Sequence, residues 1–205
     1  MPKLVLYHTI LSPFARKVRI ALAEKGVSCE KVLLDLAKGE NRTPEYLKLN
    51  PHGRVPTLVV DGIPLYESTA IVEYLNESFP KPPLLPGNPI ERARVRMLEE
   101  TIDGSFIEAL RNVLFNTSRL PEPERNPKAV DEARKKIAWH NEWLDRELAG
   151  RQFLVNGGLS VADIAGLCAL EFQRRLEIGI DPRHRNLITW YENLKSRPSA
   201  RALRE

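Results

Sequence analysis

One proline-rich segment divides the sequence into two parts. Five of the ten residues in "PKPPLLPGNP" (Pro80–Pro89) are proline. Because proline lacks a backbone N–H and has a fixed φ, such a segment is stiff and favours neither helix nor sheet. It therefore predicts a linker over 80–89, between a first domain at 1–79 and a second at 90–205. A chain of 205 residues is long enough for two domains, each with its own core.

The first part alternates between strand and helix patterns. The runs Lys3–Tyr7 and Cys29–Leu36 are strand-like, with a helical pattern between them, so they form a βαβ unit with parallel strands. A short helix is expected over Thr43–Asn50. Two strand runs joined by an Asp-Gly pair predict a hairpin over Pro56–Glu67, and a helix follows over Ser68–Ser78.

The second part contains no convincing strand. A long helix is expected over Ile90–Ser118, with a bend at Asp103–Ser105, and a second helix follows the loop Pro121–Pro127. The segment Leu159–Phe172 is apolar on most faces and predicts a central, buried helix, and a last helix is expected over Asn186–Ser196. The predicted fold is an α/β domain followed by an all-α domain.

Two serines stand at predicted helix starts. Ser12 and Pro13 precede an apolar periodic segment that stops at Gly26, the usual pattern of an N-cap followed by proline at the first helical position. The hydroxyl of Ser12 either caps this helix only or also takes part in chemistry, and the local pattern alone favours capping. Ser160 and Asp163 resemble a capping box, which indicates folding rather than catalysis.

Two further loops of the first part suit a ligand. Val55-Pro56 opens a strand, and a cis bond there would turn the Val55 N–H and C=O outward, although composition alone favours trans. Glu67 and Ser68 open a helix whose free N–H groups suit a carboxylate, while Glu67 is able to accept an ammonium group. The ordinary alternative is a capped helix start. In a βαβ-ββα sheet these loops and the Ser12 turn converge at one end, where ligands bind.

Charge and cysteine usage exclude several classes of protein. The net charge is +4, and the basic runs Arg92–Arg96 and Ala133–Lys136 have helical spacing among acidic residues, which favours solvated helix faces over a nucleic-acid site. Cys29 and Cys168 lie far apart without metal-ligand spacing, so we expect no disulfide framework and no metal site. No apolar run suits a signal peptide or a membrane span. These features predict a cytoplasmic protein.

Four motifs share an order and spacing with a known family. "SPFARKVRIALAEKG", "NPHGRVPTL", "LYESTAIVEYL" and "LSVADI" resemble the cytosolic glutathione transferases, most closely the serine-type phi, tau and zeta-like groups and their bacterial relatives. The resemblance runs from Lys3 to about Leu194. It implies a thioredoxin-like domain that binds glutathione, an all-helical domain that completes a pocket for a hydrophobic electrophile, and a homodimer with a detoxification role.

The resemblance also implies roles for single residues. Ser12 matches the serine that hydrogen-bonds the sulfur of glutathione, with Tyr7 as the competing donor because other classes use a tyrosine near this place. Val55 matches the residue that pairs with the cysteinyl backbone of glutathione, and Pro56 matches the cis-proline after it.

Other matched positions concern the two ends of glutathione. Glu67 and Ser68 match the pair that holds the γ-glutamyl amine and carboxylate. Arg54 and Asn41 lie where family members contact the glycyl carboxylate, although Asn41 replaces a histidine that the phi group often has. Lys17 stands where many members have arginine, and the sequence gives it no definite role.

The second substrate is less defined by the sequence. We expect four apolar residues to line the electrophile pocket, although the helical pair among them also fits a buried core: Ile10, Leu11, Ile102 and Phe106. Trp139 and Trp143 are equally ambiguous between core and ligand contact.

Two alternatives to a transferase stay open. A glutathione-dependent peroxidase or disulfide reductase is possible on this fold, but a disulfide reductase usually needs a cysteine where Ser12 stands. A non-enzymatic interaction protein is the other alternative, because the stringent starvation proteins share this architecture.

Overall fold

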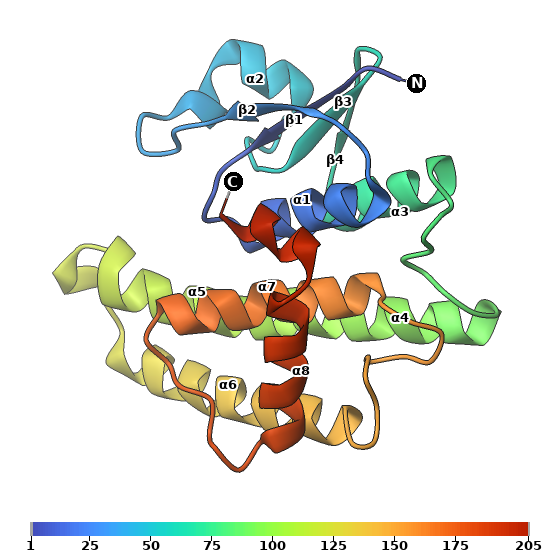
Figure 1. Cartoon of the computed structure of the whole chain (residues 1–205). Helices are drawn as coiled ribbons and strands as arrows, with labels where there is room; N and C mark the ends of the chain where they lie inside the picture. Colours follow the sequence, from blue (N-terminus) through green and yellow to red (C-terminus); the bar gives the residue numbers. More distant parts are fainter. Residues whose placement is uncertain (1, 205) are drawn as a thin grey trace. The chain divides into compact units, whose positions relative to one another are not determined.

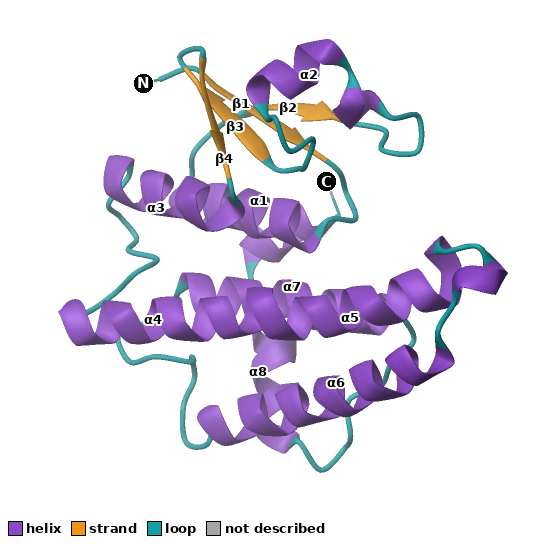
Figure 2. Ribbon diagram, turned by 180° about the vertical axis from the view of Figure 1, so that it is seen from behind, coloured by secondary structure: helices purple, strands orange, loops and turns teal. Residues whose placement is uncertain are grey.

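The computed structural model describes residues 2–204, and their contacts divide them into two compact units. The first unit runs to Leu84 and includes the residues from Pro198 onward, and the second is Leu85–Arg197. Figure 1 shows the elements coloured along the chain, and Figure 2 shows them from behind.

The first unit is built on a four-stranded sheet of order β2-β1-β3-β4. Its strands are β1 (Leu4–His8), β2 (Glu30–Leu33), β3 (Thr57–Val60) and β4 (Ile63–Tyr66). The pair β1–β2 is parallel, as predicted for the βαβ unit, and the pairs β1–β3 and β3–β4 are antiparallel. Asp61 and Gly62 both have positive φ in the hairpin turn, the backbone that an Asp-Gly pair favours.

Helices cover both faces of this sheet. The helices are α1 (Pro13–Lys25), α2 (Pro44–Leu49) and α3 (Ser68–Ser78), with 3-10 turns η1 (Glu40–Arg42) and η5 (Pro198–Leu203). Figures 1 and 2 show α1 and α3 side by side on one face and α2 on the other, which is the predicted thioredoxin-like arrangement. The core between the sheet and the helices includes Leu6, Val18, Leu58, Ile71 and Leu75, all buried.

The 3-10 helix η5 departs from the predicted boundaries. The sequence assigned all of 90–205 to the helical domain, whereas η5 packs against α1 within the first unit. Ser199 Oγ donates to Glu24 Oε1 at 2.5 Å, and the Ala202 carbonyl accepts from Arg19 Nε at 2.9 Å. Small side chains on η5 allow this close approach, and a contact through a backbone carbonyl leaves no sequence pattern.

The start of the proline-rich segment is held by one lysine. Lys25 Nζ, near the end of α1, donates to Asn76 Oδ1 at 3.0 Å and to the carbonyls of Phe79 and Pro82 at 2.7 and 2.6 Å. Burial lowers the pKa of this ammonium group. Residues 80–88 contain no helix or strand.

The second unit is helical throughout its regular elements. Its helices are α4 (Pro89–Thr101), α5 (Ile107–Leu114), α6 (Pro127–Glu147), α7 (Val161–Arg175) and α8 (Arg185–Lys195), with shorter turns η2 (Ile102–Phe106), η3 (Phe115–Arg119) and η4 (Glu122–Glu124). The predicted bend within the long first helix is a π-helical turn, η2, which separates α4 from α5.

Helix α7 is the buried centre of the second unit. Every residue from Val161 to Gln173 is buried, which confirms the prediction from its apolar character. Helices α4, α5 and α8 pack around it. Gly166 permits the approach of α8, since a Cβ there would lie 2.6 Å from an atom of the Trp190 ring.

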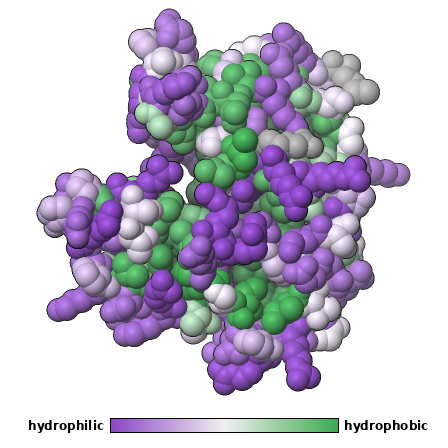
Figure 3. All heavy atoms as spheres, turned by 60° about the vertical axis from the view of Figure 1, so that its left-hand side comes forward, coloured by the Kyte–Doolittle hydropathy of each residue, from purple (hydrophilic) through white to green (hydrophobic). Residues whose placement is uncertain are grey.

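The surface is mostly polar and its charges are paired locally. Lys135 of the second basic run contacts Glu132 at 2.9 Å, and Arg94 of the first contacts Glu147 at 2.6 Å. Figure 3 shows a face on which hydrophilic side chains surround smaller apolar areas. Within residues 2–204, no helix combines the length and apolar character needed to span a membrane.

Candidate functional site

Ser12 lies at the turn between β1 and α1. It is the N-cap of α1, with extended backbone (φ −69°, ψ 123°), and its Oγ accepts a hydrogen bond from Ala15 N at 3.3 Å. Pro13 occupies the first helical position. Because capping uses a lone pair of the oxygen, the hydroxyl hydrogen of Ser12 stays able to donate. The side chain is partly exposed, so a ligand is able to reach it.

The strand register brings three loops to one edge of the sheet. Thr57, the first residue of β3, pairs with Tyr7 near the end of β1 and with Tyr66 at the end of β4. The turn after β1, the loop before β3 and the turn after β4 therefore all leave the sheet at the same end. These are the segments that carry Ser12, Val55 and Glu67.

Side chains form hydrogen bonds to the backbone of the loop before β3. The Val55-Pro56 bond is cis, as the family resemblance implied and against the preference from composition. The Arg54 carbonyl accepts from Tyr46 Oη at 2.5 Å and from Asn50 Nδ2 at 2.9 Å. The β1–β3 ladder begins at Thr57, so the N–H and C=O of Val55 lie outside it.

Asn41 and Gly53 complete this loop. Asn41 Nδ2 donates to the Gly53 carbonyl at 2.6 Å, so the side chain that the sequence placed near a carboxylate also orders the loop. Gly53 has a positive φ of 59°, and a Cβ there would lie 2.8 Å from the Asn41 carbonyl oxygen. Glycine is therefore required at this position. The side chain of Arg54 is exposed beside it.

The turn after β4 has an unusual backbone. Glu67 has φ 66° and ψ 116° as the N-cap of α3, a conformation that residues other than glycine rarely adopt and that tends to occur at functional sites. Its side chain is exposed, whereas Ser68 is buried at the first position of the helix. The backbone N–H groups of the first turn of α3 and its positive dipole end lie at this turn.

A buried lysine joins the two helix starts. Lys17 Nζ donates to Thr69 Oγ1 at 3.1 Å, which links α1, the helix that Ser12 caps, to the first turn of α3. Lys17 is only 1% exposed. Its position between the helices explains why a long cation stands there.

Tyr7 lies on the other face of the sheet from α1. In β1 the residues Leu4, Leu6 and His8 are buried and alternate with Val5 and Tyr7. The Tyr7 ring packs against Tyr46 of α2, with a centroid distance of 5.7 Å. Tyr7 therefore belongs to the α2 side of the sheet.

The sequence reasoning missed Arg19 and His8. Arg19 lies seven residues after Ser12 on α1 and is 1% exposed, and Nη1 lies 2.9 Å from His8 Nδ1. Burial and the charge of Arg19 lower the pKa of His8 to about 4. A charged residue among the buried positions of a predicted amphipathic helix is the signal that would have identified this arginine.

Comparison with known proteins identifies the family of this chain. Residues 6–83 match the family model of the glutathione S-transferase N-terminal domain, and residues 106–198 match that of the C-terminal domain. The chain is 31% identical to "Glutathione S-transferase 2" of Saccharomyces cerevisiae over 211 aligned positions, which cover 99% of this chain and 90% of the yeast protein. The chain belongs to the glutathione S-transferase family.

Two other similarities show how wide this glutathione S-transferase family is. A glutathione S-transferase from Methylobacillus flagellatus, solved with glutathione bound, has a TM-score of 0.88 and 30% identity, with 98% of each chain covered. The "Stringent starvation protein A homolog" of Coxiella burnetii is 38% identical over 122 residues, which cover 60% of this chain and 57% of that protein.

The residues predicted to line the electrophile pocket differ in exposure. Ile10 and Leu11 are 36% and 45% exposed beside Ser12. Ile102 and Phe106 are fully buried, and Phe106 stacks on His140 at 5.0 Å between ring centroids. Of the two readings that the sequence left open for this helical pair, burial favours core.

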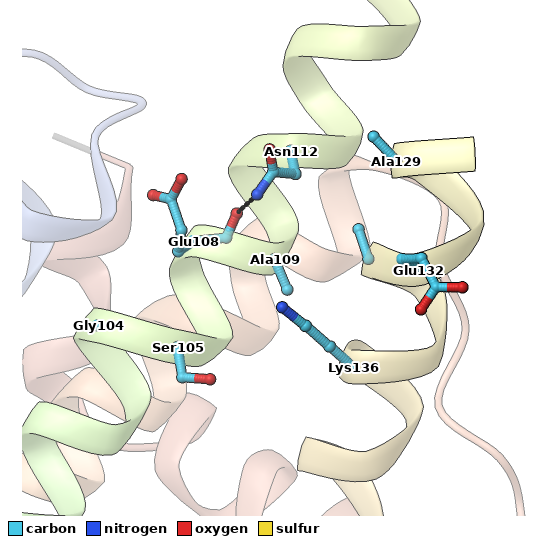
Figure 4. A pocket seen from close by; sticks show the side chains of 9 residues that line it. Gly104, Ser105, Glu108, Ala109, Asn112, Ala129, Glu132 and Lys136 are labelled. Carbon is cyan, nitrogen blue, oxygen red and sulfur yellow. Dashed lines mark hydrogen bonds between the residues drawn. The ribbon is translucent and has the colours of Figure 1, made fainter. Parts of the chain in front are cut away.

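The second unit also has a groove. It has a volume of about 270 Å³ and lies between η2–α5 and α6. Figure 4 shows Lys136 of α6 pointing toward Ala109 of α5. Ser105 Oγ lies 2.9 Å from His140 Nε2 at this groove, but burial lowers the pKa of His140 to about 4 and makes it a weak base. We assign no catalytic role to this pair.

The remaining titratable groups give no metal site. Among residues 2–204, no group of three or more His, Cys, Asp or Glu side chains is placed to hold a metal ion. Neither Cys29 nor Cys168 is part of a disulfide.

Proposed function

We propose that this protein is a glutathione transferase in which Ser12 donates a hydrogen bond to the glutathione sulfur and stabilises its thiolate. The observation that carries the proposal is the strand register, which brings the turns of Ser12, Val55 and Glu67 to one edge of the sheet. Similarity to a transferase solved with glutathione bound supports the choice of ligand.

Each loop offers a different contact to the tripeptide. The N–H and C=O of Val55, outside the ladder, pair with the cysteinyl backbone of glutathione. The first turn of α3, with Ser68, binds the γ-glutamyl carboxylate, and Glu67 accepts its amine. Arg54, exposed, and Asn41 bind the glycyl carboxylate.

A serine hydroxyl at a helix start is able to stabilise the thiolate by the free energy that this role requires. A free thiol of pKa about 8.5 is only a few per cent ionised at neutral pH. Lowering its pKa by about two units requires about 2.7 kcal/mol of preferential stabilisation of the thiolate. A hydrogen bond to a charged group contributes about 1.5–3 kcal/mol, and a helix N-terminus about 0.3–1 kcal/mol. Ser12 at the start of α1 supplies both.

The reaction itself needs no further group on the protein. The thiolate sulfur attacks an electrophilic carbon, a C–S bond forms, and the electron pair of the broken bond leaves with the departing group. Exposed Ile10 and Leu11 beside Ser12 favour an apolar electrophile. The family supports a homodimer, and two cysteines outside any disulfide support a cytoplasmic location.

Neither Tyr7 nor a cysteine fits the role of Ser12. Tyr7 packs against Tyr46 on the α2 side of the sheet. Burial raises the pKa of Cys29 to about 11, which suppresses its thiolate and makes it unsuited to disulfide exchange. Cys168 is buried within α7.

Ultraviolet titration of the bound glutathione thiolate tests the proposal. We expect the bound thiol to titrate about two pKa units below the free thiol in the parent. Ser12→Ala returns it close to the free value, whereas Tyr7→Phe leaves it at the parent value. Turnover of chlorodinitrobenzene, measured as the S-aryl conjugate by mass spectrometry, falls only in the first variant. A parent protein that binds glutathione without lowering the thiol pKa would contradict the role of Ser12.

A non-enzymatic interaction protein is the second candidate. The similarity to a stringent starvation protein A homolog favours it, since that similarity covers 60% of this chain. The two candidates differ in glutathione binding. Titration calorimetry that detects no glutathione binding at millimolar ligand would favour the interaction protein and end the transferase proposal.

A further inference from the structure

Two buried arginines of α1, chiefly Arg19, hold the backbone that leads to Ser12. Arg19 Nη1 donates to the Thr9 carbonyl at 2.9 Å, and Nη2 donates to the Ile10 carbonyl at 3.3 Å. Arg16 Nε also donates to the Ile10 carbonyl, at 2.9 Å. The carbonyls of Thr9 and Ile10, the two residues before Leu11, are therefore turned toward α1 by side chains of the helix that Ser12 caps.

The guanidinium of Arg19 also holds a segment distant in sequence. Arg19 Nε donates to the Ala202 carbonyl at 2.9 Å, so Arg19 bonds at once to the Ser12 turn and to η5. The Ser199–Glu24 bond is a second attachment of η5 to α1. The turn and the 3-10 helix are thus two ends of one buried hydrogen-bond network.

His8 completes the network as an acceptor. A guanidinium has only donors, so the His8 Nδ1 at 2.9 Å from Arg19 Nη1 carries no proton and the ring is neutral. The low pKa of His8, about 4, agrees with this protonation state. A buried charge is tolerated only when its hydrogen bonds are satisfied, and here backbone carbonyls and a neutral ring satisfy them.

We propose that Arg19 is a positioning residue for Ser12 and that η5 is part of the glutathione half-site through it. This inference rests on the proposed function, because Arg19 would act on the hydrogen bond from Ser12 to the glutathione sulfur. Arg19 is only 1% exposed, so it is not able to contact a ligand directly. It sets the path of Thr9 and Ile10, and hence the direction of the Ser12 hydroxyl, while η5 fixes the guanidinium from the other side.

Arg19→Lys tests the positioning role. A lysine keeps the charge but lacks the planar fork that reaches three carbonyls at once. We expect the pKa of bound glutathione thiol to rise by about one unit in this variant. The affinity for S-methylglutathione, which has no thiol, stays within about twofold of the parent, since the Val55 and Glu67 contacts are intact. Arg201→Lys, at an exposed arginine of η5, is the matched control and changes neither quantity.

Hydrogen exchange of the parent protein gives an independent measurement that needs no variant. Glutathione binding is expected to slow amide exchange both in residues 9–16 and in residues 199–203. Slower exchange in residues 9–16 alone overturns the role of η5, and an unchanged thiol pKa in folded Arg19→Lys overturns the role of Arg19. In both cases the proposed transferase stands. A parent that does not bind glutathione removes the proposed function and this inference together.

Discussion

Ser12 and Ser160 are both N-cap serines, yet their surroundings differ. Ser12 Oγ accepts one long hydrogen bond, 3.3 Å from Ala15 N, and the side chain is partly exposed. Ser160 is fully buried, and its Oγ donates to Asp163 Oδ2 at 2.7 Å. The hydroxyl hydrogen is therefore used inside the protein at Ser160 and is available for a ligand at Ser12.

This difference separates a structural cap from the cap that we propose takes part in chemistry. A sequence pattern reports only that a serine stands before a helix. The donor capacity left after capping depends on the residues that surround the hydroxyl, and at Ser160 the acceptor is provided three residues later by Asp163. At Ser12 the corresponding residue is Ala15, which has no acceptor on its side chain. A capping serine without an acidic residue at this spacing is thus the better candidate for chemistry.

Removal of the acceptor at the structural cap has the largest expected effect. Asp163 accepts from Ser160 N and Oγ, Leu154 N and Trp190 Nε1. Asp163→Ala leaves these buried donors without a partner, so we expect a loss of about 3–5 kcal/mol in the free energy of unfolding, measured by denaturant titration. Asp131→Ala, at an exposed residue of α6, is the control and stays within about 0.5 kcal/mol. If Asp163→Ala lowers the free energy of unfolding by less than about 1 kcal/mol, this hydrogen-bond network contributes little to stability.

The two serines themselves are expected to separate stability from chemistry. Ser160→Ala removes a buried donor and lowers the free energy of unfolding by about 2 kcal/mol, without change in the pKa of bound glutathione thiol. Ser12→Ala lowers it by about 1 kcal/mol through the lost cap and raises the thiol pKa. Denaturant titration and thiolate absorbance of both variants check this crossed pattern. Equal effects of the two variants on thiol pKa would remove the distinction drawn between them.

Local signals in the sequence predicted the caps and their helices. The helix Ser68–Ser78 has the predicted bounds, and the Asp61-Gly62 hairpin and the Ser160–Asp163 box are present as expected. Each of these depends on residues within a few positions of one another, so the pattern and the structure refer to the same interaction.

These local signals do not predict contacts between segments that are distant in sequence. The bond from Arg19 to the Ala202 carbonyl joins residues 183 positions apart, and a carbonyl is present at every residue. The cis state of Val55-Pro56 is likewise rare among X–Pro bonds, so composition favoured trans and only the family resemblance implied cis. The order of the elements predicted that the three loops converge. The strand register that brings them together pairs distant residues, so it had to come from the structure.

The buried histidines of the two units give a pH-dependent comparison. His8 and His140 each have a pKa near 4 in the folded protein, against 6.5 as the ordinary value, chiefly because of burial. Between pH 6.5 and 4 the unfolded chain therefore binds more protons, and stability falls as the pH is lowered through this window. His8→Gln, which keeps an acceptor for Arg19, and His140→Asn each reduce this slope, measured by denaturant titration across the window.

Threonine in place of Ser12 gives the smallest expected effect, and the same change at Ser160 gives a direct comparison. Ser12→Thr keeps a hydroxyl at a partly exposed N-cap, so we expect a change of a few tenths of a kcal/mol in stability and a bound-thiol pKa within about 0.5 unit of the parent. Ser160→Thr adds a methyl group at a fully buried position and costs about 1–3 kcal/mol through overpacking. Ser12→Thr tests whether any hydroxyl at this turn is sufficient to lower the pKa of the bound thiol. If Ser12→Thr raises the thiol pKa as far as Ser12→Ala does, the direction of the hydroxyl matters as much as its presence, as the network from Arg19 to this turn requires.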